Sequence, residues 1–168
     1  MTATHVIRPD RLTRRVLNPT VSWLARHGVT IAGARVLAVR GRKSGEWRHT
    51  PVNPLPYGGE RYLVAPRGHV QWTHNMRAAG GGELHKRGHV EHFRATELAD
   101  ADKPEILRAY LKKWGWEVGA FFKGLDAKST DAELLAAARK YPVFRITSTA
   151  PPSTASDSSQ DSKGGGDS

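Results

Sequence analysis

Residues 83–96 have the sequence ELHKRGHVEHFRAT, in which a turn dipeptide, Arg87-Gly88, separates two short segments. In the second segment the side chains alternate, so that Phe93 and the residues two positions from it face away from Val90. Side chains that alternate between two faces next to a two-residue turn with glycine are typical of a β-hairpin. The stretch therefore predicts antiparallel strands at 83–86 and 89–96.

Further segments of strand character lie on both sides of this hairpin. Segments 48–55 and 60–65 flank the sequence PYGG, which is a strong hairpin signal. Short apolar segments rich in β-branched residues occur at 34–39 and 143–147. The expected number of strands is therefore about six.

Three helices are expected among these strands. Segment 70–79 predicts a short helix that ends at the glycines 80–82. A longer amphipathic helix begins near Asp102 and Pro104. Its apolar face recurs at helical spacing, at Leu107, Leu111, Trp114, Val118 and Phe121. Thr130 and Glu133 form a capping box for a last helix through Lys140.

The order of these elements predicts the fold class. Strands joined by hairpins indicate an antiparallel sheet, and 168 residues suffice for one compact domain. We expect an α+β fold at residues 29–147, with the sheet as a small barrel and helices beside it. Residues 1–28 predict a basic amphipathic helical arm. Residues 148–168, rich in Ser, Pro, Gly and Asp, predict a disordered tail.

The composition limits the classes of function. The chain has no cysteine, which excludes disulfides, thiolate metal sites and thiol nucleophiles. No run approaches 18 apolar residues and no secretory signal is evident, so we expect a cytoplasmic protein. The apolar side of the arm either packs against the core or docks at a membrane surface. The formal net charge is +10, and residues 1–50 carry ten Arg and Lys against two acidic residues. This surplus favours an anionic partner: a nucleic acid, lipid headgroups or a multiply charged small molecule.

The cations concentrate in VRGRKSGEWR, residues 39–48. Two glycines bound a turn that carries Arg42 and Lys43, and Arg48 begins the next strand. Three cations and the backbone N–H groups of one turn can hold phosphate oxygens. The spacing differs from that of a P-loop, and a solvated basic hairpin tip is the alternative.

Two nearby segments can add to an anion or ring-binding site. APRGH at 65–69 places Arg67 directly after a strand. Trp72 and Asn75 share one face of the 70–79 helix, where a Trp ring beside an amide suits a planar heteroaromatic ligand. The alternative is that Trp72 belongs to the core and Asn75 is a satisfied structural amide.

Taken together, these strings resemble the deazaflavin-dependent nitroreductase family of actinobacteria. The resemblance rests on GRKSGxxRxTP at 41–51, APRG at 65–68, WxHN at 72–75 and the hairpin GGELHKRGHVEHFRATEL at 81–98, and it covers about residues 8–100. The family implies a split β-barrel that binds coenzyme F420 and reduces quinones, nitro compounds or conjugated enones.

The resemblance also implies site residues. Arg42, Lys43 and Arg48 match the positions that grip the phosphate and oligoglutamate tail of F420, and Arg67 stands where the family usually has Lys. Trp72 and Asn75 match positions that line the deazaflavin, and Thr50, Pro51 and Val52 match the strand along its ring. Ala65 and Pro66 match further cofactor-binding positions. Pro66 replaces a Ser that is frequent in the family, which removes a hydroxyl and a backbone N–H.

The family's reaction is a hydride transfer, and a proton must accompany it. Tyr141 and His74 are the candidate donors, although each is more often structural, and solvent can serve instead. The nitroreducing members present several Tyr near the C-terminal helix. Here only Tyr110 and Tyr141 follow residue 100, and the aromatic segment 114–122 takes their place.

Two functions without catalysis stay open at this point. A small basic barrel can bind nucleic acid by stacking bases on Trp47, Tyr62 and Trp72, although the cations gather at loops rather than on one sheet face. A membrane-surface lipid or quinone carrier can use the arm and segment 114–122. We expect no metal site, because His89 and His92 face opposite sides of one strand. Exposed aromatic helices and the family resemblance favour a homodimer.

Deleting residues 149–168 should leave the melting temperature and the activity almost unchanged, because the predicted tail has no large apolar side chain to contribute to a core. Thermal unfolding of the full and shortened chains measures this. A clear loss of melting temperature would contradict the tail assignment.

Overall fold

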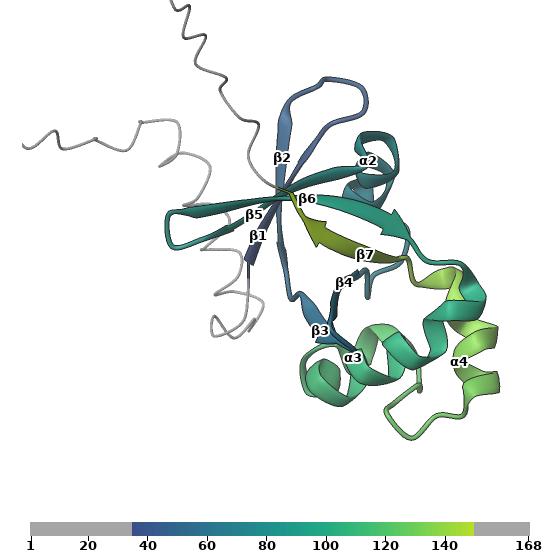
Figure 1. The fold of residues 1–168 in the computed structure, drawn as a ribbon. Coiled ribbons are helices and arrows are strands. Elements are labelled where there is room, and N and C mark those ends of the chain that lie inside the picture. The colour runs from purple at the N-terminus through teal and green to yellow at the C-terminus, as the bar shows by residue number, and fades with distance from the viewer. Residues whose placement is uncertain (1–34, 150–168) are drawn as a thin grey trace, which may run out of the picture.

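The computed structural model describes residues 35–149, and the arm at 1–28 and the tail after residue 149 lie outside them. Within this range one antiparallel sheet has the strand order β2-β1-β5-β6-β7-β4-β3, with helices against it (Figure 1). Its strands are β1 (Arg35–Arg40), β2 (Trp47–Val52), β3 (Leu55–Tyr57), β4 (Glu60–Val64), β5 (Gly81–Lys86), β6 (His89–Glu97) and β7 (Val143–Ser148). The helices are α2 (Gln71–Ala79), α3 (Lys103–Val118) and α4 (Asp131–Ala137).

The two predicted hairpins are confirmed. Lys86 pairs with His89 across a turn in which Arg87 and Gly88 have φ angles of 46° and 80°, the left-handed conformation of a tight two-residue turn. Phe93 is buried and Val90 is 41% exposed, as the alternation predicts. The β3–β4 turn at Gly58 and Gly59 has the same left-handed backbone.

The predicted strand at 48–55 is wrong in one respect, because it is two strands. β2 pairs with β1 and β3 pairs with β4, so these two strands form opposite edges of the sheet. Only Asn53 and Pro54 separate them, and Pro54 has no N–H to continue a ladder. Three Cα–Cα steps of 3.8 Å span at most about 11 Å, so the two edges of a seven-stranded sheet must come close together. The sheet therefore curls into an open barrel, which confirms the split-barrel α+β expectation.

The glycines at 80–82 have different roles from the single helix stop expected. Gly80 ends α2 with φ 70°, and its N–H donates to the Met76 carbonyl at 2.8 Å. Gly82 belongs to β5, where an added Cβ would lie 2.4 Å from the Ala38 carbonyl oxygen on β1. The close approach of these two strands requires a residue without a side chain.

The core has two parts. One lies inside the curled sheet, around Leu37, Leu63, Met76, Phe93 and Phe144. The other lies between α3, α4 and the β3–β4–β7 side of the sheet, with Leu107, Leu111, Phe122, Leu134 and Val143 at its centre. The helices therefore cover one end of the barrel, as Figure 1 shows.

The α3 pattern is confirmed at Leu107, Leu111 and Val118, which are buried, but not at Phe121, which is 39% exposed. Phe122 is fully buried in its place. The cause is a change of period, because residues Gly119–Phe122 form a 3-10 helix that turns more tightly than α3.

The C-terminal elements follow the prediction closely. Thr130 caps α4 in the expected capping box with Glu133, whose backbone N–H donates to the Thr130 hydroxyl. β7 continues through Ser148, and the Thr149 N–H donates to the His92 carbonyl at 2.9 Å. Strand β7 thus includes Ser148, the first residue of the segment assigned to the tail. No helix among residues 35–149 is long and apolar enough to cross a membrane.

Gly82→Ala should lower the free energy of unfolding by about 1–3 kcal/mol, because its Cβ overlaps a backbone oxygen of the neighbouring strand. Gly115→Ala in α3 is the matched control. An added Cβ there meets nothing within 4 Å, so this change should stabilise by about 0.4–1 kcal/mol. Urea unfolding measures both, and equal effects would contradict the strand contact.

Candidate functional site

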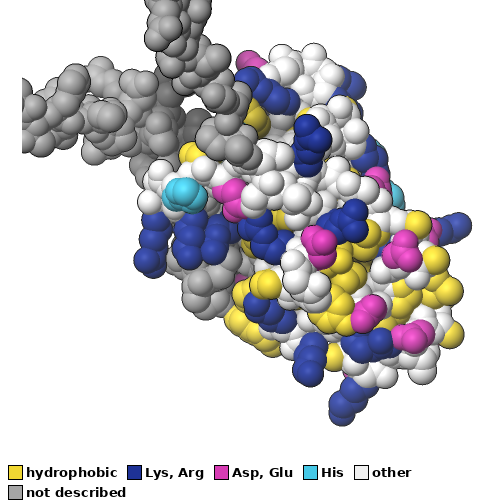
Figure 2. Space-filling model, in the orientation of Figure 1, with side chains coloured by type: hydrophobic (Ala, Val, Ile, Leu, Met, Phe, Trp, Pro, Cys, Tyr) yellow, Lys and Arg dark blue, Asp and Glu magenta, His cyan; other side chains and the backbone are white. Residues whose placement is uncertain are grey.

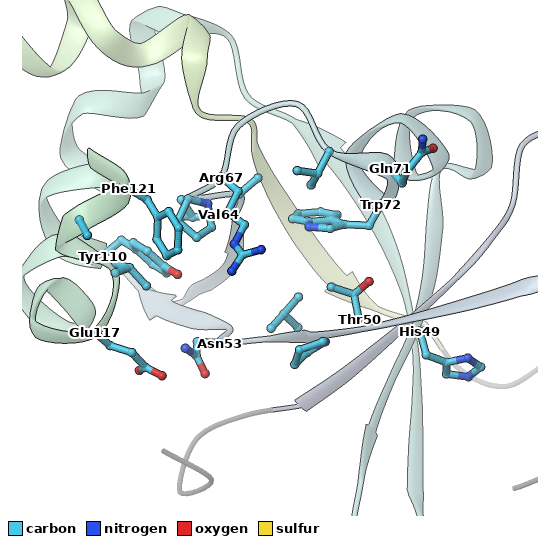
Figure 3. Close-up of a pocket in the computed structure, with 17 residues that line it drawn as sticks. His49, Thr50, Asn53, Val64, Arg67, Gln71, Trp72, Tyr110, Glu117 and Phe121 are labelled. Atoms are coloured by element: carbon cyan, nitrogen blue, oxygen red, sulfur yellow. The ribbon is translucent and has the colours of Figure 1, made fainter. Parts of the chain in front are cut away.

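A cavity of about 740 Å³ opens beside the seam where the two sheet edges meet. Its walls come from β2, the segment that follows β4, the start of α2 and the C-terminal half of α3 (Figure 3). The described residues that line it are His49, Thr50, Pro51, Val52, Asn53, Val64, Ala65, Pro66, Arg67, Val70, Gln71, Trp72, Tyr110, Glu117, Val118, Ala120 and Phe121. Most of these groups are apolar or aromatic, with a few polar groups at the ends, which is the usual character of a small-molecule site.

Trp72 is both a core residue and a wall of the cavity. Its side chain is only 9% exposed, and its ring centroid lies 5.7 Å from that of Phe144. Figure 3 shows its indole on one side of the cavity with the Thr50 hydroxyl directed toward it from β2. Trp72 is therefore a core residue that also lines the cavity, and packing against Phe144 fixes the orientation of its ring. Its contact with a planar ligand stays a prediction.

The basic turn between β1 and β2 is held closed by its own backbone. The Gly41 N–H donates to the Glu46 carbonyl at 2.7 Å, and the Gly45 N–H donates to the Gly41 carbonyl at 2.8 Å. The Ser44 hydroxyl accepts from the Glu46 N–H at 3.2 Å. Lys43 and Arg48 project into solvent from this turn, and Arg48 is 3.6 Å from the Glu46 carboxylate.

Asn75 connects this turn to α2. Its buried side-chain oxygen accepts from the Arg42 backbone N–H at 3.2 Å and from the Arg42 guanidinium at 2.9 Å. The same guanidinium donates to Gln71, a residue of the cavity, at 2.9 Å. The basic turn is therefore fixed beside the mouth of the cavity at the α2 end.

The structure brings together seven of the eleven residues expected to hold a cofactor. Thr50, Pro51, Val52, Ala65, Pro66, Arg67 and Trp72 line the cavity. Arg42, Lys43 and Arg48 lie outside it on the basic turn, and Asn75 lies behind the wall as the anchor of that turn. Asn75 therefore has a structural role in this geometry, and its contact with a cofactor ring stays a prediction.

Arg67 lies between two hollows. Its guanidinium is 4.9 Å from the centre of the Phe121 ring, a cation–π contact, and the residue lines the large cavity. It also lines a smaller, open depression together with Lys123, Lys140 and Tyr141. Arg67 therefore adds a positive charge to the cavity wall opposite β2.

Neither candidate proton donor lines the large cavity. The Tyr141 hydroxyl donates to the Phe121 carbonyl at 3.0 Å, its ring stacks on Phe122, and burial raises its pKa. His74 lies on α2 with its Nδ1 3.4 Å from the Arg77 guanidinium. A direct proton transfer from either group to a ligand in the cavity has no support in this geometry.

Five polar residues of the cavity were missed by the sequence analysis as site residues: His49 on β2, Asn53 at the seam, Gln71 on α2, and Tyr110 and Glu117 on α3. Burial raises the pKa of the Tyr110 phenol, and the nearby Glu117 charge raises it further, so the phenol is neutral near pH 7. Tyr110 and Glu117 are seven residues apart, so both lie on one face of the helix. This spacing could have indicated a shared polar position on one face of α3. The sequence near α3 does not indicate, however, that this face lies opposite β2.

Comparison with known families gives one extended match. A family model described as F420H(2)-dependent quinone reductase matches residues 14–118. No curated protein matches the chain significantly in sequence.

Three solved structures illustrate the structural similarity. An F420-H2 dependent reductase (FDR-A) is 19% identical with a TM-score of 0.47, over 69% of this chain and 95% of that chain. A structure described as a domain-swapped dimer is 18% identical with a TM-score of 0.48, over 81% and 99%. A conserved hypothetical protein from Mycobacterium tuberculosis is 15% identical with a TM-score of 0.44, over 88% and 86%.

Asn75→Ala should lower the free energy of unfolding by about 1–2 kcal/mol, because the Arg42 N–H loses its acceptor. It should also speed hydrogen exchange at the Arg42 amide. Asn75→Asp is the matched control, since it keeps an oxygen in place and adds a charge that the Arg42 guanidinium can pair with. Urea unfolding and amide exchange measure the two variants, and equal losses would show that the oxygen is not the anchor.

Proposed function

Because the chain belongs to the F420H(2)-dependent quinone reductase family, we propose that its cavity holds the deazaflavin of F420 together with an electron acceptor. The enzyme is an F420H2-dependent oxidoreductase. The acceptor classes we propose are quinones, nitro compounds and conjugated enones. The observation that carries the proposal is a basic turn fixed by hydrogen bonds at the mouth of a largely apolar cavity.

The shape and chemistry of the cavity fit a planar ring. Its volume of about 740 Å³ lies within the range of ordinary small-molecule sites. Pro51 and Val52 on β2 and the Trp72 indole offer apolar surfaces of the cavity wall to such a ring. Thr50 and Gln71 supply the few polar groups that can fix its orientation.

The basic turn fits the anionic part of the cofactor. The F420 tail carries a phosphate and several glutamates, and Arg42, Lys43 and Arg48 are the cations next to the cavity at the α2 end. Since Arg42 is tied to Asn75 and Gln71, its charge is positioned before a ligand arrives, which lowers the ordering cost of binding. Lys43 and Arg48 are exposed and can reach a tail that runs along the turn.

The residues of this chain position the reactants, and the cofactor supplies the redox chemistry. When bound, reduced F420 supplies a hydride. The apolar walls at Val64, Ala65 and Val118 exclude water from the reacting atoms. The Arg67 guanidinium lies on the wall opposite β2, where a positive charge stabilises the negative charge that develops on an acceptor.

The proton that accompanies the hydride has several candidate sources. Tyr141 and His74 stay predictions, and their positions outside the cavity lead us to favour solvent or a group of the cavity wall. Homodimer formation and membrane-surface docking through residues 1–28 also stay predictions.

The two alternatives without catalysis gain no support from the family match. Figure 2 shows one group of adjacent Lys and Arg side chains at the left of the visible face, and further ones at separate places on it. A nucleic-acid barrel would present them as a continuous track.

Lys43→Ala should weaken binding of oxidised F420 at least tenfold, about 1.4 kcal/mol, because it removes a cation expected to contact the tail. Fluorescence titration measures the Kd, with FMN as the ligand control. Lys128→Ala, an exposed lysine between α3 and α4, is the matched control and should leave the Kd unchanged. The absence of F420 binding by the unmodified chain would refute the proposed site.

A further inference from the structure

The cavity end opposite the basic turn contains polar atoms without partners. Both carboxylate oxygens of Glu117 and the side-chain oxygen of Asn53 are buried, and none has a hydrogen-bond partner among the described residues. Both residues line the cavity, and Figure 3 shows them at the end away from Trp72 and Gln71. Buried polar groups are nearly always hydrogen-bonded in folded proteins, so such a cluster at a cavity wall points to a ligand.

These atoms have one property in common: all three are hydrogen-bond acceptors. The fourth unpartnered buried atom among the described residues is the Trp114 indole nitrogen, a donor, and Trp114 does not line the cavity. The neutral Tyr110 phenol is a hydrogen-bond donor beside Glu117, but it donates to none of these three oxygens, which have no partner among the described residues. A ligand group that satisfies this end must therefore donate hydrogen bonds.

The rest of the cavity separates this end from the place proposed for the cofactor. The apolar walls and Thr50 lie between Glu117 and the α2 end, where the basic turn is fixed. An acceptor lying between the ring surface of β2 and the α3 wall would place one of its edges against Glu117 and Asn53.

We propose that Glu117 and Asn53 select electron acceptors that carry a hydrogen-bond donor, an amino or hydroxyl group, at the edge facing α3. The inference rests on the proposed function, since it assigns the acceptor end of the same cavity. An acceptor with only carbonyl or nitro oxygens at that edge leaves the three oxygens unpaired. A site of this kind discriminates between ligands because a ligand without the donor group leaves buried oxygens unpaired, which weakens its binding.

The test compares 2-amino-1,4-naphthoquinone with 2-methyl-1,4-naphthoquinone, which have similar shapes but differ in one donor group. The amino preference is the kcat/KM for the amino quinone divided by the kcat/KM for the methyl quinone. Comparing this preference between the wild type and each variant cancels the intrinsic reactivities of the two quinones. Glu117→Leu should reduce the amino preference at least tenfold. Glu117→Gln, which keeps one acceptor oxygen, should reduce it less. Glu60→Leu, at an exposed carboxylate of β4, is the matched control and should leave it unchanged.

A second readout separates selection from a structural role. If Glu117 is kept for its ligand, Glu117→Leu should raise the melting temperature, because it removes buried unpartnered oxygens. A carboxylate that mainly supports the fold would instead lower the melting temperature on removal. A lower melting temperature with an unchanged quinone preference would therefore overturn the inference.

Cofactor binding is measured in parallel so that the two proposals fail separately. Equilibrium dialysis of each naphthoquinone without F420 gives the same preference as a ratio of Kd values. No F420 binding with a retained amino preference refutes the proposed function, and it supports only the preference of Glu117 and Asn53 for a ligand that carries a hydrogen-bond donor. F420 binding without an amino preference, or F420 binding weakened by Glu117→Leu, refutes the inference alone.

Discussion

Two residues, Asn53 and Pro54, join the opposite edges of the sheet, and the shape of the molecule depends on this short link. A flat sheet of seven strands would hold its edges far apart, so the link forces the sheet to curl. The curl encloses one part of the core around Leu37 and Phe144 and leaves an incompletely closed seam. The cavity lies beside that seam, with Asn53 in its wall and α3 covering the open side. The same constraint therefore creates both the core and the site.

The hydrogen bonds between Arg42 and α2 hold the positive charges of the basic turn beside the cavity. The basic turn is the exposed tip of the β1–β2 hairpin, and on a free hairpin its cations would point into solvent in many directions. The Asn75 oxygen and the Gln71 side chain fix Arg42 to α2, and Trp72 on the same helix forms the cavity wall. One helix thus aligns a ring-binding surface with an anion-binding turn, which matches the two chemical parts of F420.

The sequence predicts best those features that depend on neighbouring residues. Alternation and turn glycines identify both hairpins, and the Thr130–Glu133 pair identifies the α4 cap. The division at Asn53–Pro54 was missed, because strand propensity continues through it while the pairing partner changes. Phe121 and Phe122 were exchanged, because a 3-10 turn follows α3. The resemblance identifies the β2 and 65–67 walls, but Tyr110 and Glu117 required the packing of α3 against a strand some sixty residues earlier in the chain.

The strand pairing also determines how the chain can assemble. Three hairpins, β1–β2, β3–β4 and β5–β6, join neighbours in sequence and can form within microseconds. The β4–β7 ladder is different, because it pairs Val64 with Val143, nearly eighty residues further on. Closing so long a loop costs conformational entropy before the hydrogen bonds and contacts of the ladder can compensate for it. We therefore expect this pairing to govern the folding rate. The cavity wall at Val64 and Ala65 adjoins that ladder, so we expect the site to be completed late in folding.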